Sequence, residues 1–291
     1  MANLKEIRNR ITSISSTMQI TSAMKMVSAA KLKRAQDAIT EMRPYSEKLQ
    51  EILGNLSATL DLSENAFSEA REVKNVLIVG ITSNRGLCGG FNNNIIKRVN
   101  QLVNVEYAAV NPKVLCLGKK IKDVYKKTDK YFINDELTKV EDIFNDLSFD
   151  NASVIGENLM KLFTDKSFDK VIVVYNKFIN AASQEVMTED FLPIIPTVVE
   201  GGNGTADYIF EPSKSEIVED LIPKSLKIQL FKGLLDSNAS EHGARMTAMH
   251  KATDNANDMK NDLTLSYNKA RQAAITNEIL EIVGGAEALN G

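Results

Sequence analysis

Apolar residues near the N-terminus recur three and four residues apart, which is the spacing of a coiled-coil seam. No proline or glycine interrupts residues 1–43, so this pattern predicts one long helix. Pro44 predicts a kink or break, after which a helical pattern resumes to about residue 60. The expected seam runs through Leu4, Ile7, Ile11, Ile14, Met18 and Thr21, and then drifts to Met24, Val27, Ala30, Arg34 and Ala38.

The C-terminal part of the chain has the same spacing, which predicts a helix from about residue 213 to about residue 285. Several seam positions are small or polar, and such positions weaken a coiled coil but set its register. Since a lone helix gains little from propensity, we expect the two ends to pair as antiparallel helices. The seam comprises Met246, Met249, Thr253, Ala256, Lys260, Leu263, Tyr267, Ala270, Ala274, Asn277 and Glu281.

Short apolar runs alternate with helical patterns in the middle of the chain. This alternation predicts a mostly parallel sheet with helices on both faces. The predicted fold class is therefore α/β plus coiled coil, with long antiparallel terminal helices flanking a Rossmann-like α/β domain. The expected domains are 1–60, 73–212 and 213–291. The expected strands are 76–79, 113–118, 170–175 and a weaker 184–192, the expected helices are 94–103, 119–127 and 152–165, and residues 207–212 are expected to be extended.

The charge is unevenly distributed along the chain. The net charge is −3, which argues against a general nucleic-acid binder, and 43% hydrophobic residues are typical of a soluble protein. Residues 1–48 nevertheless hold nine Lys and Arg against four Asp and Glu, a local charge of +5. A basic helix on an acidic protein predicts an acidic partner surface. A merely solvated helix face is the plain alternative.

Two cysteines, Cys88 and Cys116, are too few for a disulfide framework. Redox control by a disulfide is not expected, and a reducing cytosolic compartment fits this count. No window approaches the ~18 consecutive apolar residues of a membrane-spanning helix. The first residues enter a patterned helix at once, so neither a signal peptide nor a transit peptide is expected.

A glycine-rich segment, residues 82–92, follows a predicted strand and opens a predicted helix, where phosphates bind in many α/β proteins. It lacks the Gly-Lys-Ser/Thr of a P-loop, and Gly86, Gly89 and Gly90 do not fit the G-x-G-x-x-G fingerprint. We therefore interpret the glycines as permitting a tight turn and close helix–sheet packing. No nucleotide binding and no cofactor are predicted.

Catalytic candidates are few. Cys88 beside Arg85 could act as a nucleophile, but the two histidines, His242 and His250, lie on the last predicted helix. They stand eight residues apart, so they do not form a helical metal site by themselves, and we expect ordinary helix-surface residues. The sequence predicts neither an enzyme nor a metal site.

Several motifs resemble those of the gamma subunits of F-type ATP synthases, and the resemblance covers essentially the whole chain. The C-terminal run 275–288 is the most specific of them. Asn84 departs from the family pattern, which usually has Asp there, and this casts doubt on charge pairing at that loop. The motifs are Ile20-Thr-Ser-Ala-Met-Lys-Met-Val-Ser-Ala-Ala-Lys31, Ser83-Asn-Arg-Gly-Leu-Cys-Gly89, Tyr175-Asn-Lys-Phe-Ile-Asn180, Ala244-Arg-Met-Thr-Ala-Met249, Ala252-Thr-Asp-Asn255 and Tyr267-Asn-Lys-Ala-Arg-Gln272.

The resemblance implies a rotary shaft that performs no bond chemistry. Its paired helices would enter a hexamer of alternating alpha and beta subunits, and its α/β foot would sit on the membrane c-ring and bind the epsilon subunit. Proton-driven rotation would cycle the catalytic beta subunits, a population shift driven by rotation. The expected place is the cytoplasmic face of a bacterial inner membrane, held there through the complex.

The resemblance also suggests which residues contact partners. Lys31, Lys33 and Arg34 would face acidic loops of the beta subunits, and loop 201–208 would contact the c-ring. Arg245, Gln272 and Thr276 would contact the inner wall of the hexamer. Candidate partner-contact residues are Met24, Lys31, Lys33, Arg34, Arg85, Cys88, Arg245, Gln272, Thr276 and Glu278.

Two other readings of the sequence stay open. One is a coiled-coil tether bearing a degenerate nucleotide-like domain, and the other is a nucleotide-dependent oxidoreductase. Nucleotide binding by the isolated chain would favour the enzyme.

Overall fold

The structure is a computed structural model that describes residues 4–57, 66–69, 71–137, 140–194 and 214–290. Contacts divide the chain into two compact units, one of residues 29–245 and one that combines residues 1–28 with 246–291. The expected extended segment 207–212 and the expected ring-contact loop 201–208 lie outside the described residues.

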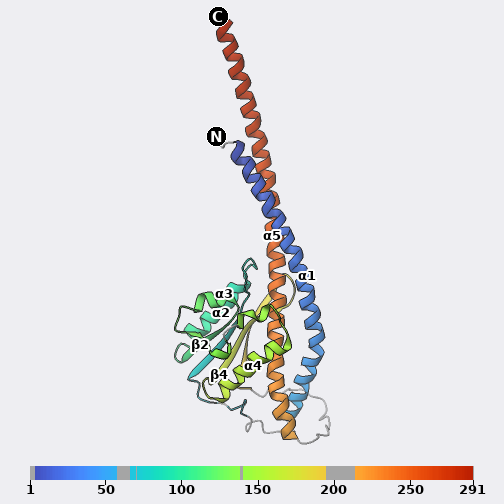
Figure 1. The fold of residues 1–291 in the computed structure, drawn as a ribbon, viewed down its shortest axis with the longest axis vertical. Helices are drawn as coiled ribbons and strands as arrows, with labels where there is room; N and C mark the ends of the chain where they lie inside the picture. The colour runs from blue at the N-terminus through green and yellow to red at the C-terminus, as the bar shows by residue number, and fades with distance from the viewer. Residues whose placement is uncertain (1–3, 58–65, 70, 138–139, 195–213, 291) are drawn as a thin grey trace. The chain divides into compact units, whose positions relative to one another are not determined.

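A five-stranded sheet forms the larger unit, with the strand order β3-β2-β1-β4-β5 (Figure 1). Strand β1 pairs in parallel with β2 and β4, and β2 pairs in parallel with β3. Strand β5 is antiparallel to β4. This arrangement confirms the predicted mostly parallel sheet. The strands are β1 Asn75–Ile81, β2 Asn111–Leu117, β3 Tyr131–Phe132, β4 Lys170–Phe178 and β5 Gln184–Leu192.

Strand β1 lies at the centre of the sheet, where Val79 pairs with Leu115 of β2 and Val173 of β4. Every residue of β1 from Val76 to Ile81 is buried. A strand covered on both faces reads as a continuous apolar run, and this is why residues 76–79 are such a clear strand in the sequence.

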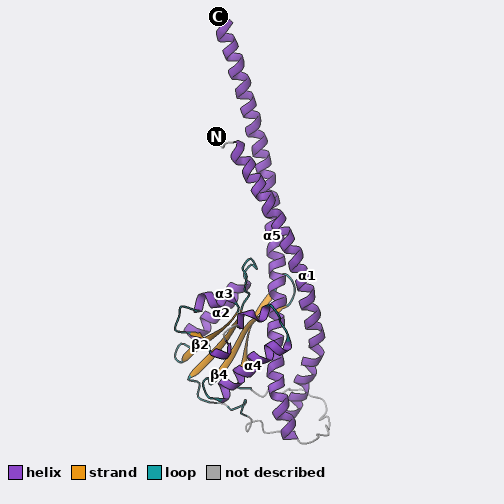
Figure 2. Cartoon of the chain, in the orientation of Figure 1, coloured by secondary structure: helices purple, strands orange, loops and turns teal. Residues whose placement is uncertain are grey.

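Helices cover both faces of the sheet, as predicted (Figure 2). One face packs against α2 (Phe91–Gln101) and α3 (Lys119–Tyr125), and the other packs against α4 (Phe149–Thr164) and the first part of α5 (Lys214–Asn290). The helix predicted over 94–103 turns into a π-helical segment, Leu102–Glu106. Two 3₁₀ segments, Asp135–Leu137 and Val140–Phe144, were not expected from the sequence.

Helix α1 (Leu4–Ser57) differs from the prediction in two ways. It runs through Pro44, so of the predicted kink or break the break is excluded. Its buried positions after Thr21 are Ser28, Leu32 and Ala35, whereas Val27, Ala30 and Arg34 of the predicted stripe are exposed. Each step of three residues falls about 60° short of a full turn, so consecutive steps of three carry a stripe off the buried face.

The smaller unit is an antiparallel pair of helical segments, 4–28 of α1 and 246–290 of α5. The Arg8 guanidinium donates to the Tyr267 hydroxyl at 2.6 Å, and the Thr21 and Thr253 hydroxyls lie 2.8 Å apart. Residues later in α1 therefore contact residues earlier in α5, so the two helices run in opposite directions. This confirms the predicted antiparallel pairing.

The predicted seam of this pair holds along most of its length. All six α1 positions from Leu4 to Thr21 are buried or half-buried, and so are the α5 seam positions from Met246 to Ala270. The remaining predicted members Ala274, Asn277 and Glu281 are exposed, so the seam prediction is wrong there. The described part of α1 begins at Leu4, and only one turn later Arg8 contacts Tyr267 of α5.

Candidate functional site

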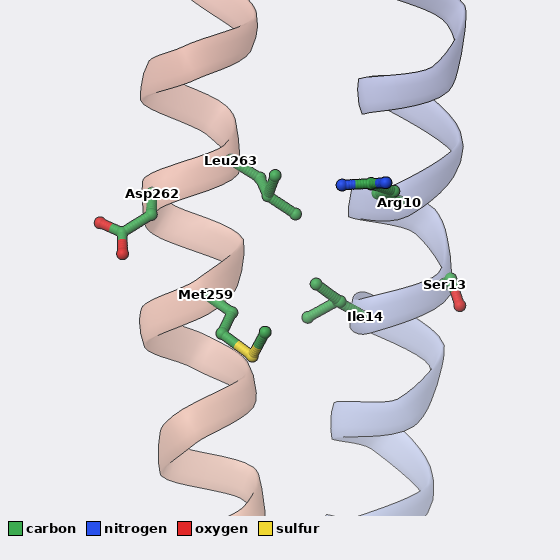
Figure 3. Close-up of a pocket in the computed structure, with 6 residues that line it drawn as sticks. All are labelled: Arg10, Ser13, Ile14, Met259, Asp262 and Leu263. Atoms are coloured by element: carbon green, nitrogen blue, oxygen red, sulfur yellow. The ribbon is translucent and has the colours of Figure 1, made fainter. Parts of the chain in front are cut away.

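The seam between α1 and α5 contains both polar links and an open groove. The Thr21 side chain is buried, so its contact with Thr253 fixes one register of the two helices. Figure 3 shows Ile14, Met259 and Leu263 pointing toward one another across the space between the helices. This groove measures about 350 Å³ and is also lined by Arg10, Ser13 and Asp262.

The last turns of α5 form an uncovered helical tip. Every residue from 271 to 287 is exposed, and nothing in the described part of the chain covers this segment. Isolated helices of this length are marginal in water, and exposed apolar clusters mark interaction surfaces. The exposed apolar residues are Ile275, Ile279, Leu280, Ile282 and Val283.

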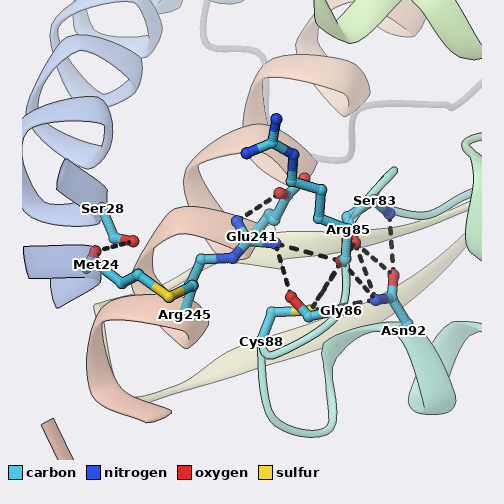
Figure 4. A network of polar contacts seen from close by, with 9 residues as sticks. All are labelled: Met24, Ser28, Ser83, Arg85, Gly86, Cys88, Asn92, Glu241 and Arg245. Atoms are coloured by element: carbon cyan, nitrogen blue, oxygen red, sulfur yellow. Dashed lines mark hydrogen bonds and ion pairs between the residues drawn. The ribbon is translucent and has the colours of Figure 1, made fainter. Parts of the chain in front are cut away.

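The glycine loop between β1 and α2 turns tightly, as the sequence interpretation predicts. Gly89 has φ +58° and Leu87 has φ 63°, both in the left-handed region. The turn is held from inside by Ser83 and Asn92 (Figure 4). The Ser83 amide donates to the Asn92 Oδ1 at 2.9 Å, and the Ser83 hydroxyl donates to the Arg85 carbonyl at 2.5 Å.

Close packing at this end of the sheet depends on other glycines than those of the loop. A Cβ on Gly118 would lie 2.1 Å from the carbonyl oxygen of Thr82, and Gly118 has φ +120°. A Cβ on Gly80 would lie 2.3 Å from Cδ1 of Ile121, whereas one on Gly86 would have room. The close packing predicted for the loop glycines is therefore wrong for Gly86 and Gly89, and it is Gly80 and Gly118 that need to lack a side chain.

A buried ion pair on α5 reaches the glycine loop. The Arg245 Nη1 lies 2.6 Å from the Glu241 Oε1, and its Nη2 donates to the carbonyl oxygens of Arg85 and Gly86 at 3.3 Å each (Figure 4). Burial raises the pKa of Glu241, and the adjacent Arg245 guanidinium opposes that rise. Removing one partner of a buried pair leaves a costly lone charge, so this contact specifies how the loop meets α5.

Cys88 and Arg245 were expected to contact partner subunits, but the structure buries both side chains, at 1% and 7% exposure. Burial raises the pKa of the Cys88 thiol, which disfavours a reactive thiolate. The Asn92 Nδ2 donates to the Cys88 sulfur at 3.1 Å. The sequence did not reveal this internal network, because its members come together only through the fold.

The two histidines differ in environment. His250 is exposed and lies 3.3 Å from Asp254, as expected for a surface residue. His242 does not fit that expectation, because it is half-buried and its Nδ1 has no hydrogen-bond partner among the described residues. Burial, together with the positive charges of Arg245 and Lys31, lowers the pKa of His242 to about 4. The described residues contain no cluster of three potential metal ligands.

Asn84, where the resemblance led us to expect Asp, bridges two other segments. Its Oδ1 accepts from the backbone amide of Lys119 at 2.9 Å, and its Nδ2 donates to the carbonyl oxygen of Glu141 at 2.9 Å. Both halves of the amide are used, so the position is satisfied by hydrogen bonds without charge pairing.

All but one of the remaining partner-contact candidates are exposed. Lys31, Lys33 and Arg34 are exposed on α1, and Lys33 pairs with Asp37 at 2.7 Å. Met24 is half-buried, and the Ser28 hydroxyl donates to its carbonyl oxygen at 2.7 Å (Figure 4). Arg85, Gln272, Thr276 and Glu278 are exposed. Of the candidates, the structure links Arg85 with Arg245 directly and places Cys88 in the same network.

These features define a class of protein, an α/β domain whose terminal helices are long and pair with each other. A family model described as ATP synthase matches residues 3–289. Two gamma chains of ATP synthase, from Christiangramia forsetii and Flavobacterium johnsoniae, are 63% and 62% identical over 292 residues, covering 100% of both chains in each comparison. The chain belongs to the ATP synthase gamma-chain family.

Solved structures have the same fold. A chain in the central stalk and c-ring structure of the Tetrahymena thermophila mitochondrial ATP synthase is 25% identical with a TM-score of 0.57, and the match covers 80% of this chain and 99% of that one. A chain in the OSCP/F1/c-ring structure of the Euglena gracilis enzyme is 23% identical with a TM-score of 0.65, covering 98% and 94%. None of the described helices is long and apolar enough to cross a membrane.

Proposed function

We propose that this chain is the rotary shaft of an F-type ATP synthase and carries out no bond chemistry itself. The uncovered α5 segment 271–287 is the observation that supports this most strongly. A helix that is exposed all round and carries uncovered apolar side chains needs a partner, and the bore of a hexamer of alternating alpha and beta subunits supplies one. Gln272, Thr276 and Glu278 then contact the inner wall.

The α/β domain acts as the foot of this shaft. It rests on the membrane c-ring and binds the epsilon subunit, on the cytoplasmic face of a bacterial inner membrane. Proton flow turns the ring, the foot follows, and the helices shift the beta subunits between open and closed states. The interior of the foot supports this passive role, since its glycine loop is held by internal hydrogen bonds and carries a buried thiol of raised pKa.

Co-assembly and nucleotide binding test this function. The purified chain is expected to bind neither ATP nor NADH in a fluorescence titration, and to form an active ATPase when mixed with the alpha and beta subunits. Deleting residues 271–291 is expected to weaken that assembly, because it removes the uncovered tip. Nucleotide binding by the chain alone, or an ATPase that forms equally well without it, would contradict the proposal.

The basic residues of α1 provide a second test. Lys31, Lys33 and Arg34 are exposed and face acidic loops of the beta subunits under this proposal. Changing all three to Ala is expected to lower rotation-coupled ATP hydrolysis several-fold, and to reduce its dependence on salt. The matched control changes Lys74, Lys97 and Lys127, which are exposed lysines of the foot, to Ala. Equal activity of the two variants would exclude this contact.

A further inference from the structure

A stripe of polar and small residues on α5 faces the β4–β5 edge of the sheet. Its members stand four, three, four and three residues apart, so they share one face of the helix. None of them has a large apolar side chain. We call this stripe the seat, and it consists of Gln229, Gly233, Asp236, Ser240 and Gly243.

The first part of the seat contacts a pair of side chains on the two edge strands. The Gln229 Nε2 donates to the Glu189 Oε2 at 3.3 Å, and the Tyr175 hydroxyl donates to the other oxygen of Glu189 at 2.6 Å. A Cβ on Gly233 would be 3.5 Å from the Tyr175 ring, so this ring packs directly over the glycine. Strand β4, strand β5 and helix α5 are therefore joined at one point.

The middle of the seat bonds the β4 backbone. The Asp236 carboxylate accepts from the Phe178 amide, and the Ser240 hydroxyl donates to the Asn176 carbonyl oxygen at 3.0 Å. Asp236, Ser240 and Asn176 are all buried. The Asn176 side chain in turn donates to the Phe91 carbonyl oxygen at 3.2 Å, so the link continues to the start of α2.

The last seat position, Gly243, packs closely against the end of β4 and the turn that follows it. A Cβ on Gly243 would lie 3.2 Å from Cα of Ala181 and 3.4 Å from the Phe178 ring. Only glycine lets the helix backbone come this near without displacing its neighbour.

A second stripe on α5 holds the helix by apolar packing. Its members Ile222, Leu226, Leu230 and Leu234 are buried in the core cluster that also contains α4. Apolar burial is non-directional, so it supplies free energy but leaves the rotation of a helix about its axis weakly defined. Hydrogen bonds have narrow geometry, and buried ones are costly to leave unmade.

We propose that the seat fixes the angle of α5 about its own axis and so transmits torque between the foot and the shaft. This inference rests on the function proposed above. The apolar stripe keeps the helix attached, while the seat prevents it from turning against the sheet. Loss of the seat is therefore expected to produce slippage, in which ATP hydrolysis continues but moves fewer protons.

The test uses the complete ATP synthase in inverted membrane vesicles. One variant combines Gln229→Leu, Asp236→Leu and Ser240→Ala, which removes the seat hydrogen bonds and keeps good helix formers. Its ATP hydrolysis rate is expected to stay within two-fold of the parent, while protons pumped per ATP fall at least two-fold. The matched control, Asp220→Leu with Lys224→Leu, alters exposed residues of the same helix and is expected to pump normally.

A conservative pair keeps the test decisive if the triple variant does not assemble. Asp236→Asn retains an oxygen that accepts from Phe178 and is expected to couple normally, whereas Asp236→Leu loses the bond and is expected to pump less per ATP. If these two variants pump the same number of protons per ATP, or if the triple variant pumps as many as the parent, the seat does not transmit torque. Failure of the parent chain itself to assemble or pump would instead count against the proposed function.

Discussion

At the scale of single residues, the glycine loop of the foot is held by asparagine side chains that both donate and accept hydrogen bonds. Asn92 holds the glycine loop from inside, and Asn84 ties that loop to the start of α3 and to the 3₁₀ segment at Glu141. Such bonds are worth about 1 kcal/mol each in net stability, but a partner left unsatisfied in a buried place costs more.

Replacement of Asn84 tests this bridge. Asn84→Ala removes both bonds and is expected to lower the free energy of unfolding by about 2 kcal/mol. Asn84→Asp keeps the acceptor for the Lys119 amide and loses only the donor to Glu141, so a smaller loss of about 1 kcal/mol is expected. Urea unfolding followed by circular dichroism measures both. An equal loss for the two variants would show that the donor alone matters.

His242 makes the stability of the foot depend on pH. Its pKa falls from an ordinary value of about 6.5 to about 4 in the folded chain. Between these values the unfolded chain binds a proton that the folded chain does not, so stability decreases as the pH falls from about 6.5 toward 4. The expected loss is about 2 kcal/mol after allowing for partial exposure.

The measurement is the free energy of unfolding against pH for the parent and for His242→Gln. The variant should show a flatter profile between pH 6.5 and 4, because the titrating group is gone. His250→Gln is the control, since it removes an exposed histidine of the same helix and leaves His242 in place, so the change between pH 6.5 and 4 should remain. A parent profile that is flat in this range would contradict the lowered pKa.

At the scale of elements, two loop glycines with positive φ face different constraints. Gly118 has a backbone carbonyl where a Cβ would be, whereas Gly89 has open space. Gly89→Ala is therefore expected to cost only the conformational penalty, about 1 to 2 kcal/mol. Gly118→Ala adds a clash with backbone and is expected to cost at least about twice as much by urea unfolding. Similar losses at both positions would mean that the β2–α3 turn can move aside.

Elements with local signals were predictable from the sequence. The apolar run of β1 and the full span of β5 follow from patterning, and so do the seam positions of α1 up to Thr21 and of α5 up to Ala270. Strand β3 is two residues long and exists only by pairing with β2, so no local pattern could indicate it. The stripe predicted for α1 after Thr21 does not match the buried face, because consecutive steps of three residues do not follow the 3.6-residue period of a helix.

The site was less predictable, since burial of polar residues is decided by distant parts of the chain. Arg245 and Glu241 look like an exposed i,i+4 pair in the sequence, yet both are buried, and Arg245 donates to two carbonyl oxygens of the distant loop 82–92. The seat has the same character. Its 4-3-4-3 spacing is present in the sequence, but polar and small residues at that spacing normally indicate a solvent face.

At the scale of the whole molecule, charge and function fit together. The chain as a whole is acidic, with a net charge of −3, while α1 exposes basic residues at Lys31, Lys33 and Arg34. Salt should therefore weaken assembly of this chain with the alpha and beta subunits, through the exposed pairs more than through the apolar tip. Binding measured at 0.05 M and 0.5 M salt is expected to differ at least several-fold. Salt-independent binding would assign assembly to apolar contacts alone.

The antiparallel pairing of α1 with α5 also has a consequence for biosynthesis. Arg8 and Tyr267 are separated by 259 residues, and Thr21 and Thr253 by 232. On the ribosome, the first helix emerges long before its partner exists, and contacts between such distant residues form slowly. The apolar seam of the nascent N-terminus therefore stays uncovered until the last part of the chain is made. Because uncovered apolar surface invites aggregation, this stretch is where a chaperone would be needed during synthesis.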